Sequence, residues 1–367
     1  MMGFSFLYCF VSLTVAYFTC SIILVHFYVY WFFLFYLTVA YFTCSIIQPL
    51  CHNNERFALL QFNQSLTIYG LGAVAGFSKV ASWRLEEDCC SWKGVTCNNH
   101  TNCITRLDLN SARLSSHINS TGTLFHLVHL EWLNLANNEL HNFKITAIIN
   151  NISRLKDLNL SFCGFSGQIS SELLDLSNIE FIDLSDNNIV THSFQFRNLG
   201  LEILVEILTN LKVLNLKTVY IASSIPHSLA NLSSFTYLSL HDCGLQGAFP
   251  TQIFQLPNLS FLRLRLNVNL TGSIPEFEWS NSLTALDISR CNFSGTIPSL
   301  IGNLTKLVSL DLSFNNFLGE LPLSIRNLAS LKELDVTNCN LSGLIPSLLD
   351  NLTQLSDLFM GKNQLTG

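Results

Sequence analysis

The chain of 367 residues has 19 Lys and Arg against 25 Asp and Glu, and its net charge of −6 with no basic run argues against nucleic acid as a partner. Charged residues make up 12% and apolar residues 49% of the sequence, which is more apolar than an ordinary soluble domain. The sequence holds no GxSxG, HExxH, Walker or kinase motif, and its ten His are scattered. We therefore predict no enzyme, no cofactor and no metal site.

The apolar excess lies in residues 1–47, which contain no Asp, Glu, Lys or Arg. This segment is long enough for two spans of about 20 residues. It contains LTVAYFTCSII at residues 13–23 and again at residues 37–47. We interpret residues 1–47 as an internally duplicated signal peptide, cleaved shortly before Cys51, and the alternative is an uncleaved signal anchor.

Residues 48–103 are predicted to form an N-terminal cap, because the end of a repeat array exposes apolar surface that must be covered. The spacing of Phe57, Leu59, Leu60 and Phe62, continued at Leu66, predicts a short helix that faces a core.

Four cysteines of the cap, Cys51, Cys89, Cys90 and Cys97, indicate two disulfides in a secreted chain. Sequence alone allows three pairings, of which we favour Cys51 with Cys89 and Cys90 with Cys97. A zinc site formed by these cysteines is disfavoured, since no His follows at ligand spacing. Cys103 is an additional thiol that could contest the favoured pairing.

Residues 104–367 repeat the frame LxxLxLxxNxL about every 24 residues, which predicts an array of about ten and a half leucine-rich repeats. Each repeat adds one strand to a parallel sheet, and the strands are expected near residues 107, 133, 158, 182, 214, 238, 262, 286, 310, 334 and 358. The interval from Ile182 to Leu214 is longer than the others, and its apolar spacing predicts a local helix.

Several residue types recur at fixed points of the repeat. Prolines and the glycines before them, such as Gly247 and Pro250, are predicted to form turns on the convex side. One buried slot is filled by Asn138, Asn187, Asn267, Asn315 and Asn363, or by Cys163, Cys243, Cys291 and Cys339. The amides should satisfy backbone groups of adjacent coils, and the cysteines should be buried free thiols.

The motifs CHNNERFALLQF, SWKGVTC, NSTGTLFHLVHLEWLNLANNEL and IPxxLxNLxxL together resemble plant leucine-rich-repeat receptor-like proteins. The resemblance implies an α/β solenoid, a plant-type extracellular leucine-rich-repeat horseshoe with a parallel β-sheet on the concave face and a disulfide-stapled N-terminal cap. It also implies a ligand-recognition ectodomain at the plasma membrane, extracellular or secreted to the apoplast, which acts in defence or developmental signalling. The expected partners are an extracellular peptide, protein or glycan ligand and a receptor kinase co-receptor.

Two alternatives remain at this stage. One is a secreted protein similar to polygalacturonase inhibitors, and the other is a truncated fragment without function. The chain ends at Gly367 in mid-repeat, so we expect it to be truncated at the C-terminus.

Eleven sequons are predicted glycosylation sites: Asn63, Asn99, Asn119, Asn151, Asn231, Asn258, Asn269, Asn292, Asn303, Asn340 and Asn351. Asn159 also begins a sequon, but it lies within a predicted strand.

The predicted ligand patch consists of Tyr237, Phe261, Arg263, Arg265 and Arg290, which we place on exposed strand positions of three adjacent repeats. Aromatic and Arg side chains dominate binding hot spots, and three clustered positive charges would suit an anionic peptide or glycan. A second row, Asp108, Asp183, Asp287, Asp311 and Asp335, is interpreted as a solvated strand face.

Overall fold

The structure is a computed structural model that describes residues 31–32, 51–64, 66–68, 79–116, 123–141, 152–187, 194–196, 200–276, 282–345 and 351–366. The chain divides into two compact units, Met1–Leu50 and Cys51–Gly367. Apart from Trp31 and Phe32, the predicted signal segment lies outside the described residues. None of the helices among those residues is both long enough and apolar enough to cross a membrane.

The cap opens the second unit with helix α2 (Asn53–Gln64), which buries Glu55, Ala58, Leu59 and Phe62. These positions follow the i, i+3, i+4, i+7 spacing of one helix face. Phe57 lies off that face and is 50% exposed, so the prediction that it faces the core is wrong.

Two disulfides close the cap, Cys51 to Cys89 and Cys90 to Cys97, which is the pairing favoured from the sequence. The short helices η1 (Lys79–Ser82) and η2 (Cys89–Ser91) lie between α2 and strand β2 (Val95–Cys97). The indole rings of Trp83 and Trp92 stack beside them with centroids 5.1 Å apart. Cys103 is a buried free thiol and does not contest the pairing.

Twelve strands form the main sheet, in which each coil of the solenoid contributes one strand. In order they are β2, β3 (Ile104–Asp108), β5 (Trp132–Asn134), β6 (Asp157–Asn159), β8 (Phe181–Asp183), β10 (Val213–Asn215), β11 (Tyr237–Ser239), β13 (Phe261–Arg263), β15 (Ala285–Asp287), β17 (Ser309–Asp311), β19 (Glu333–Asp335) and β21 (Asp357–Phe359). The eleven predicted strand positions all lie within these strands, so the predicted solenoid is confirmed. Strand β2 pairs antiparallel with β3 and was not predicted.

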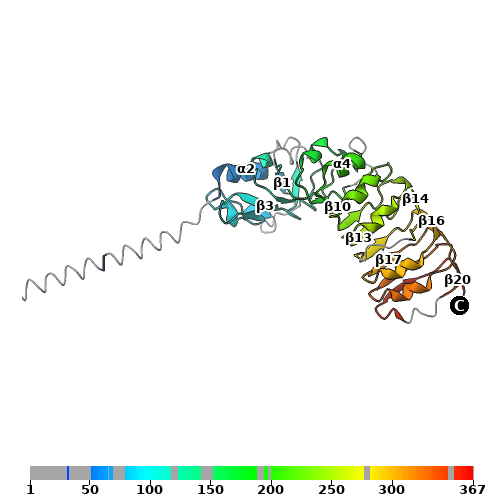
Figure 1. The fold of residues 1–367 in the computed structure, drawn as a ribbon. Coiled ribbons are helices and arrows are strands. Elements are labelled where there is room, and N and C mark those ends of the chain that lie inside the picture. Colours follow the sequence, from blue (N-terminus) through cyan, green and yellow to red (C-terminus); the bar gives the residue numbers. More distant parts are fainter. Residues whose placement is uncertain are drawn as a thin grey trace, which may run out of the picture. The chain divides into compact units, whose positions relative to one another are not determined.

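A second set of parallel strands lies on the other side of the coils (Figure 1). It comprises the four-stranded sheet β12 (Gln246–Ala248), β14 (Asn269–Gly272), β16 (Asn292–Thr296) and β18 (Asn316–Leu318), together with the pairs β7 (Gly167–Gln168) with β9 (Phe194–Gln195) and β20 (Ser342–Leu344) with β22 (Gln364–Thr366). Strand β1 (Leu66–Ile68) pairs antiparallel with β4 (Leu114–Ser116) in the first coils. The prediction of simple turns is therefore wrong at Gly247 and at Gly295 and Gly343, the glycines that hold the equivalent position in later repeats. These glycines lie inside strands, although their φ angles of 79°, 84° and 85° still require the freedom of glycine.

Short helices complete the coils between the two sets of strands. They are η3 (Thr123–His126), η4 (Ser171–Asp175), η5 (His227–Asn231), η6 (Thr251–Gln255), η7 (Ser299–Asn303) and η8 (Leu323–Asn327). A proline directly precedes each of η5 to η8, where the fixed φ suits the start of a helix and no backbone donor is needed. The long interval contains helix α4 (Leu201–Ile207), as predicted.

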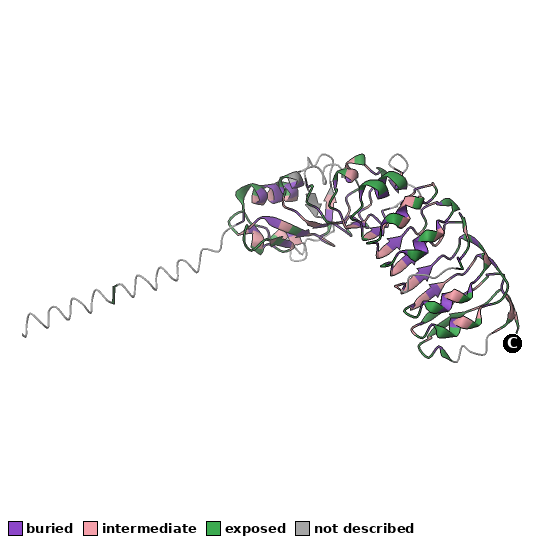
Figure 2. Ribbon diagram, in the orientation of Figure 1, coloured by how far each residue is buried: buried purple, intermediate pink, exposed green. Residues whose placement is uncertain are grey.

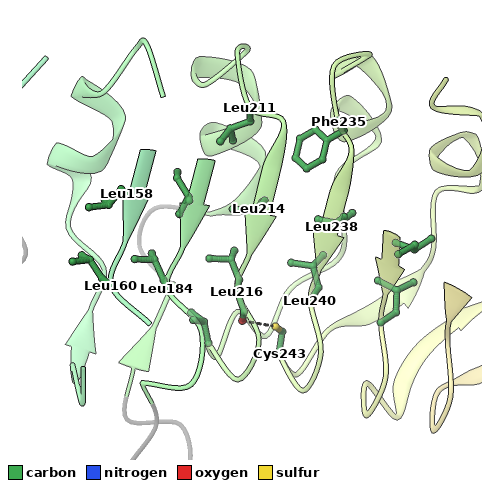
Figure 3. Packing of buried hydrophobic residues seen from close by; sticks show 14 of the residues in the cluster. Leu158, Leu160, Leu184, Leu211, Leu214, Leu216, Phe235, Leu238, Leu240 and Cys243 are labelled. Atoms are coloured by element: carbon green, nitrogen blue, oxygen red, sulfur yellow. Dashed lines mark hydrogen bonds between the residues drawn. The ribbon is translucent and has the colours of Figure 1, made fainter. Parts of the chain in front are cut away.

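The core is a ladder of leucines that stack on the same residues of the next coil (Figure 3). Leu214, for example, is paired in register with Ile182 on one side and Leu238 on the other. Figure 2 shows buried residues along the strands of the main sheet, while exposed residues lie on the short helices as well as in the turns. The Asn and Cys of the repeated slot lie in this core, except for the half-buried Asn363. Cys243 donates its thiol proton to the carbonyl of Leu216 at 3.1 Å.

Candidate ligand-binding face

Four apolar side chains lie at the same position of adjacent strands in the main sheet. Phe181, Val213, Tyr237 and Phe261 are register partners from β8 through β10 and β11 to β13. We call them the apolar row. All four are half-buried, and the rings of Tyr237 and Phe261 stack at 4.3 Å with an interplanar angle of 5°. The row is a continuous apolar surface across four coils.

The sequence predicted Tyr237 and Phe261 in this row but missed Phe181 and Val213. The signal that could have found them is the residue before the central Leu or Ile of each strand. When the repeats are aligned on that residue, the preceding positions become neighbours in the sheet. The 32-residue interval between Ile182 and Leu214 interrupts the constant spacing and concealed the continuity.

Two charged pairs lie immediately before strands of the main sheet, and one of them, Lys212 with Glu180, precedes β10 and β8 of the apolar row. Lys156 contacts Glu131 with 2.8 Å between Nζ and Oε2, and Lys212 contacts Glu180 with 2.6 Å between the same atoms. The four side chains are substantially exposed, so each pair contributes little to stability. The Lys212–Glu180 pair places balanced charge at one edge of the row, whereas the Lys156–Glu131 pair precedes β6 and β5, outside the row.

The three predicted arginines have partners in the structure. Arg263 Nε lies 3.2 Å from Asp287 Oδ2, and its guanidinium lies 5.1 Å from the ring centroid of Phe261. Arg265 Nη1 lies 3.5 Å from Asp311 Oδ2, whereas the guanidinium of Arg290 covers the ring of Phe314 at 4.0 Å.

Two details of the predicted patch need correction. Arg265 and Arg290 lie in the turns after β13 and β15 and not on strands. The positive charge is also not free, because two carboxylates balance two of the three arginines.

The five aspartates of the second predicted row lie at the ends of their strands, where their carboxylates accept hydrogen bonds from the backbone. Each Oδ1 accepts a hydrogen bond from the backbone N–H two residues later, in Asp108, Asp183, Asp287, Asp311 and Asp335. Asp287 is only 9% exposed, and burial raises the pKa of its carboxyl. The prediction of a solvated row is therefore wrong at Asp287, where Arg263 and Ser289 supply the compensating contacts.

His241 adds a neutral polar group beside the arginines, and sequence reasoning missed it. Burial, together with the nearby charges of Lys217 and Arg265, lowers the pKa of His241 to about 4. Its Nδ1 is buried and, within the described residues, has no hydrogen-bond partner. The imidazole is therefore uncharged at neutral pH and retains an unused polar atom.

Nine of the eleven predicted glycosylation sites lie among the described residues, and eight of those nine are exposed. Asn63 is half-buried and donates from Nδ2 to the carbonyl of Val80 at 3.3 Å. Asn119 and Asn151 lie outside the described residues. Asn159 lies in β6, where its Oδ1 accepts from the backbone and hydroxyl of Ser161.

Comparison with known proteins agrees with this geometry. Residues 52–98 match the leucine rich repeat N-terminal domain, and residues 154–176, 282–304, 306–328 and 330–352 match the leucine rich repeat. Receptor-like protein 6 of Arabidopsis thaliana is 36% identical over 253 residues, which cover 66% of this chain and 26% of that protein.

Solved structures show the same fold in receptor ectodomains. The ectodomain of the Arabidopsis receptor kinase HAESA, in complex with an IDA peptide hormone, superposes with a TM-score of 0.70 at 28% identity, covering 85% of this chain and 50% of that one. HAESA in complex with IDA and the co-receptor SERK1 gives a TM-score of 0.69 at 28% identity, covering 86% and 50%.

The cap, the repeats and the parallel sheet define a leucine-rich-repeat protein. The chain belongs to the plant leucine-rich-repeat receptor-like proteins, as its sequence motifs predicted. It spans about a quarter of the length of the curated relatives it matches.

Proposed function

We propose that this chain is the ligand-recognition part of a plant cell-surface receptor-like protein, and that an extracellular peptide binds across strands β8 to β13. The observation that carries the proposal is the apolar row, in which Tyr237 and Phe261 stack on adjacent strands beside the paired charges of Arg263 and Asp287. Aromatic side chains that are already packed lose little entropy when a ligand covers them, and they are typical binding hot spots.

The spacing of the row suits an extended peptide. Neighbouring strands lie about 4.8 Å apart, so the row extends over roughly 14 Å, and an extended peptide of about four residues covers that length. Apolar side chains of the peptide would contact the row. Its polar groups would meet the Lys212–Glu180 pair on one side, and His241 with the arginines on the other.

The charge balance argues for a ligand that is not strongly anionic. Since Arg263 and Arg265 are paired with Asp287 and Asp311, a carboxylate or sulfate on the ligand would compete with an existing partner. The proposal therefore favours a peptide with an apolar or aromatic centre over an anionic glycan.

The remaining parts of the proposal rest on the sequence and the resemblance. Residues 1–47 direct the chain to the cell surface, residues 48–103 close the solenoid, and residues 104–367 carry the ligand face. The exposed sequons are glycosylated. Signalling in defence or development passes through a receptor kinase co-receptor, by analogy with HAESA bound to IDA and SERK1.

The test uses the chain secreted from a eukaryotic host and a phage-displayed peptide library as the probe. The tightest selected peptide is measured by calorimetry against the wild type, Tyr237→Ala and Phe181→Ala. We expect at least about tenfold weaker binding for each variant, which corresponds to about 1.4 kcal/mol.

Trp132→Ala is the matched control, because Trp132 holds the same strand position on β5 but lies beyond Asp157, outside the apolar row. Its affinity should stay within about twofold of the wild type. Unchanged affinity in both row variants, with folding intact, would remove the row as the binding site.

A further inference from the structure

Three potential metal ligands from three separate segments of the chain lie close together in the cap and the first coils. Glu55 lies on α2, Cys103 lies just before β3, and His129 lies between η3 and β5. A carboxylate oxygen, the thiol sulfur and an imidazole nitrogen of these residues all lie within 4.8 Å of one another. Cys103 lies 48 residues and His129 lies 74 residues after Glu55 in the chain, so no short sequence motif reveals them.

The polar atoms of this cluster are buried but incompletely partnered. Glu55 is 2% exposed, and its Oε2 accepts a hydrogen bond from the backbone N–H of Ile104 at 3.0 Å. Its Oε1 and the Nδ1 of His129 are 3.8 Å apart, and neither has a hydrogen-bond partner among the described residues. Cys103 is a free thiol, 7% exposed, with only a long contact of 3.7 Å to the carbonyl of Thr101.

A buried carboxylate oxygen without a partner is costly, so its persistence requires a compensating group. A proton shared with His129 would need the two atoms to approach more closely than 3.8 Å. His52 does not fill the gap, because its ring nitrogen Nε2 contacts the carbonyl of Thr101 at 3.0 Å and its side chain is exposed.

We propose that Glu55, Cys103 and His129 bind a divalent transition-metal ion of the Zn²⁺ class. Thiolate, imidazole and carboxylate are the three protein ligand types of zinc. In tetrahedral coordination with bonds of about 2.0–2.3 Å, ligand atoms are roughly 3.3–3.7 Å apart. The separation of 3.8 Å between Glu55 Oε1 and His129 Nδ1 is close to that range. Cys103 releases its proton to solvent when it binds, and water completes the fourth position.

The other cluster of possible ligands in the cap does not compete for the ion. It consists of Cys51, Asp88, Cys89 and Cys90, but its three sulfurs are all in disulfides and are not available as thiolates. Within the described residues, Cys103 is therefore the free thiol of the cap. An ion held by this cluster would join α2 to the first two coils of the solenoid, in addition to the disulfides.

The test uses the secreted full chain, stripped with a chelator and kept free of reductant so that both disulfides remain closed. Co²⁺ is the probe, because a thiolate ligand gives a charge-transfer band in the near ultraviolet. We expect one Co²⁺ per chain with this band, and displacement of Co²⁺ by Zn²⁺. Zn²⁺ should also raise the unfolding temperature.

Three variants assign the site. Cys103→Ala should abolish the band, and His129→Gln should abolish or strongly weaken binding while changing a side chain that is 38% exposed. Cys163→Ala is the matched control, since Cys163 is another buried free thiol outside the cluster, and it should keep the band. A folded wild type without the band, or a band that survives Cys103→Ala, would overturn the proposal.

Discussion

At the residue scale, the hydrogen bonds in the repeated slot explain why Asn is favoured there. They also show which of these bonds remain when Cys takes its place. Asn267 Oδ1 accepts from the backbone N–H groups of Cys243 and Leu245, and its Nδ2 donates to the carbonyls of Leu240 and Leu264. Cys291 occupies the next slot and donates its thiol proton to Leu264 at 3.2 Å. The amide therefore satisfies both donors and acceptors of the backbone, whereas the thiol serves mainly acceptors.

This difference predicts unequal costs for removing the two side chains. Asn267→Ala leaves three buried backbone groups without their partner, since the carbonyl of Leu264 still accepts from Cys291, and we expect a loss of about 3–5 kcal/mol in the free energy of unfolding. Cys291→Ala should cost only about 1–2 kcal/mol. Equilibrium unfolding in urea checks the pair of variants. Equal losses would contradict the hydrogen-bonding explanation of the slot.

The candidate site was only partly predictable at this scale. Tyr237 and Phe261 could be found because their repeats have constant spacing, so alignment on the leucines makes them neighbours. The partners of the arginines could not be found in the same way. Arg265 contacts Asp311 across an intervening coil. That contact depends on the conformation of the arginine side chain and not on the strand register alone.

At the element scale, the short helices pack closely from coil to coil. Helix η7 contacts η8, and a Cβ atom added to Gly302 would lie 2.4 Å from the backbone oxygen of Ser324. Backbone cannot move aside as a flexible side chain can, so the spacing of the coils depends on glycine here. Gly361 is the contrasting case, because a Cβ atom there would meet nothing within 4 Å.

We therefore predict that Gly302→Ala destabilises the protein by about 1–3 kcal/mol, the usual cost of overpacking. Gly361→Ala, which introduces the same methyl group, should change stability by less than about 0.5 kcal/mol. Both values come from thermal unfolding followed by circular dichroism. The explanation fails if the two substitutions have the same effect.

The second set of strands and strand β2 are the elements that the sequence did not predict. Strands such as β12, with the residues Gln246, Gly247 and Ala248, are short and exposed and lack alternating apolar residues. The main sheet and the short helices hold each coil beside the next. The backbones of the second set of strands are thereby brought within hydrogen-bond distance of one another. The antiparallel strand β2 is similar, since the cap disulfide from Cys90 to Cys97 ends in it.

At the scale of the whole molecule, the two edges of the main sheet differ. At one edge β2 pairs with β3, and the cap covers it with α2 and two disulfides. At the other edge all three residues of β21 are exposed, with Leu358 39% and Phe359 49% exposed. In the middle, Leu238 and Leu262 have no exposed surface.

Since each coil of a solenoid contacts only its neighbours, stability should vary along the array. We predict that amide hydrogen exchange is fastest in β21, slowest in β11 and β13, and slow again in β3, because the cap supplies the contacts that an edge strand lacks. Hydrogen–deuterium exchange with mass spectrometry resolves these segments. Reducing the cap disulfides should accelerate exchange in β2 and β3 while leaving β13 unchanged, since several intact coils separate it from the cap. Equal protection of β21 and β13 would instead mean that the array opens as one cooperative unit.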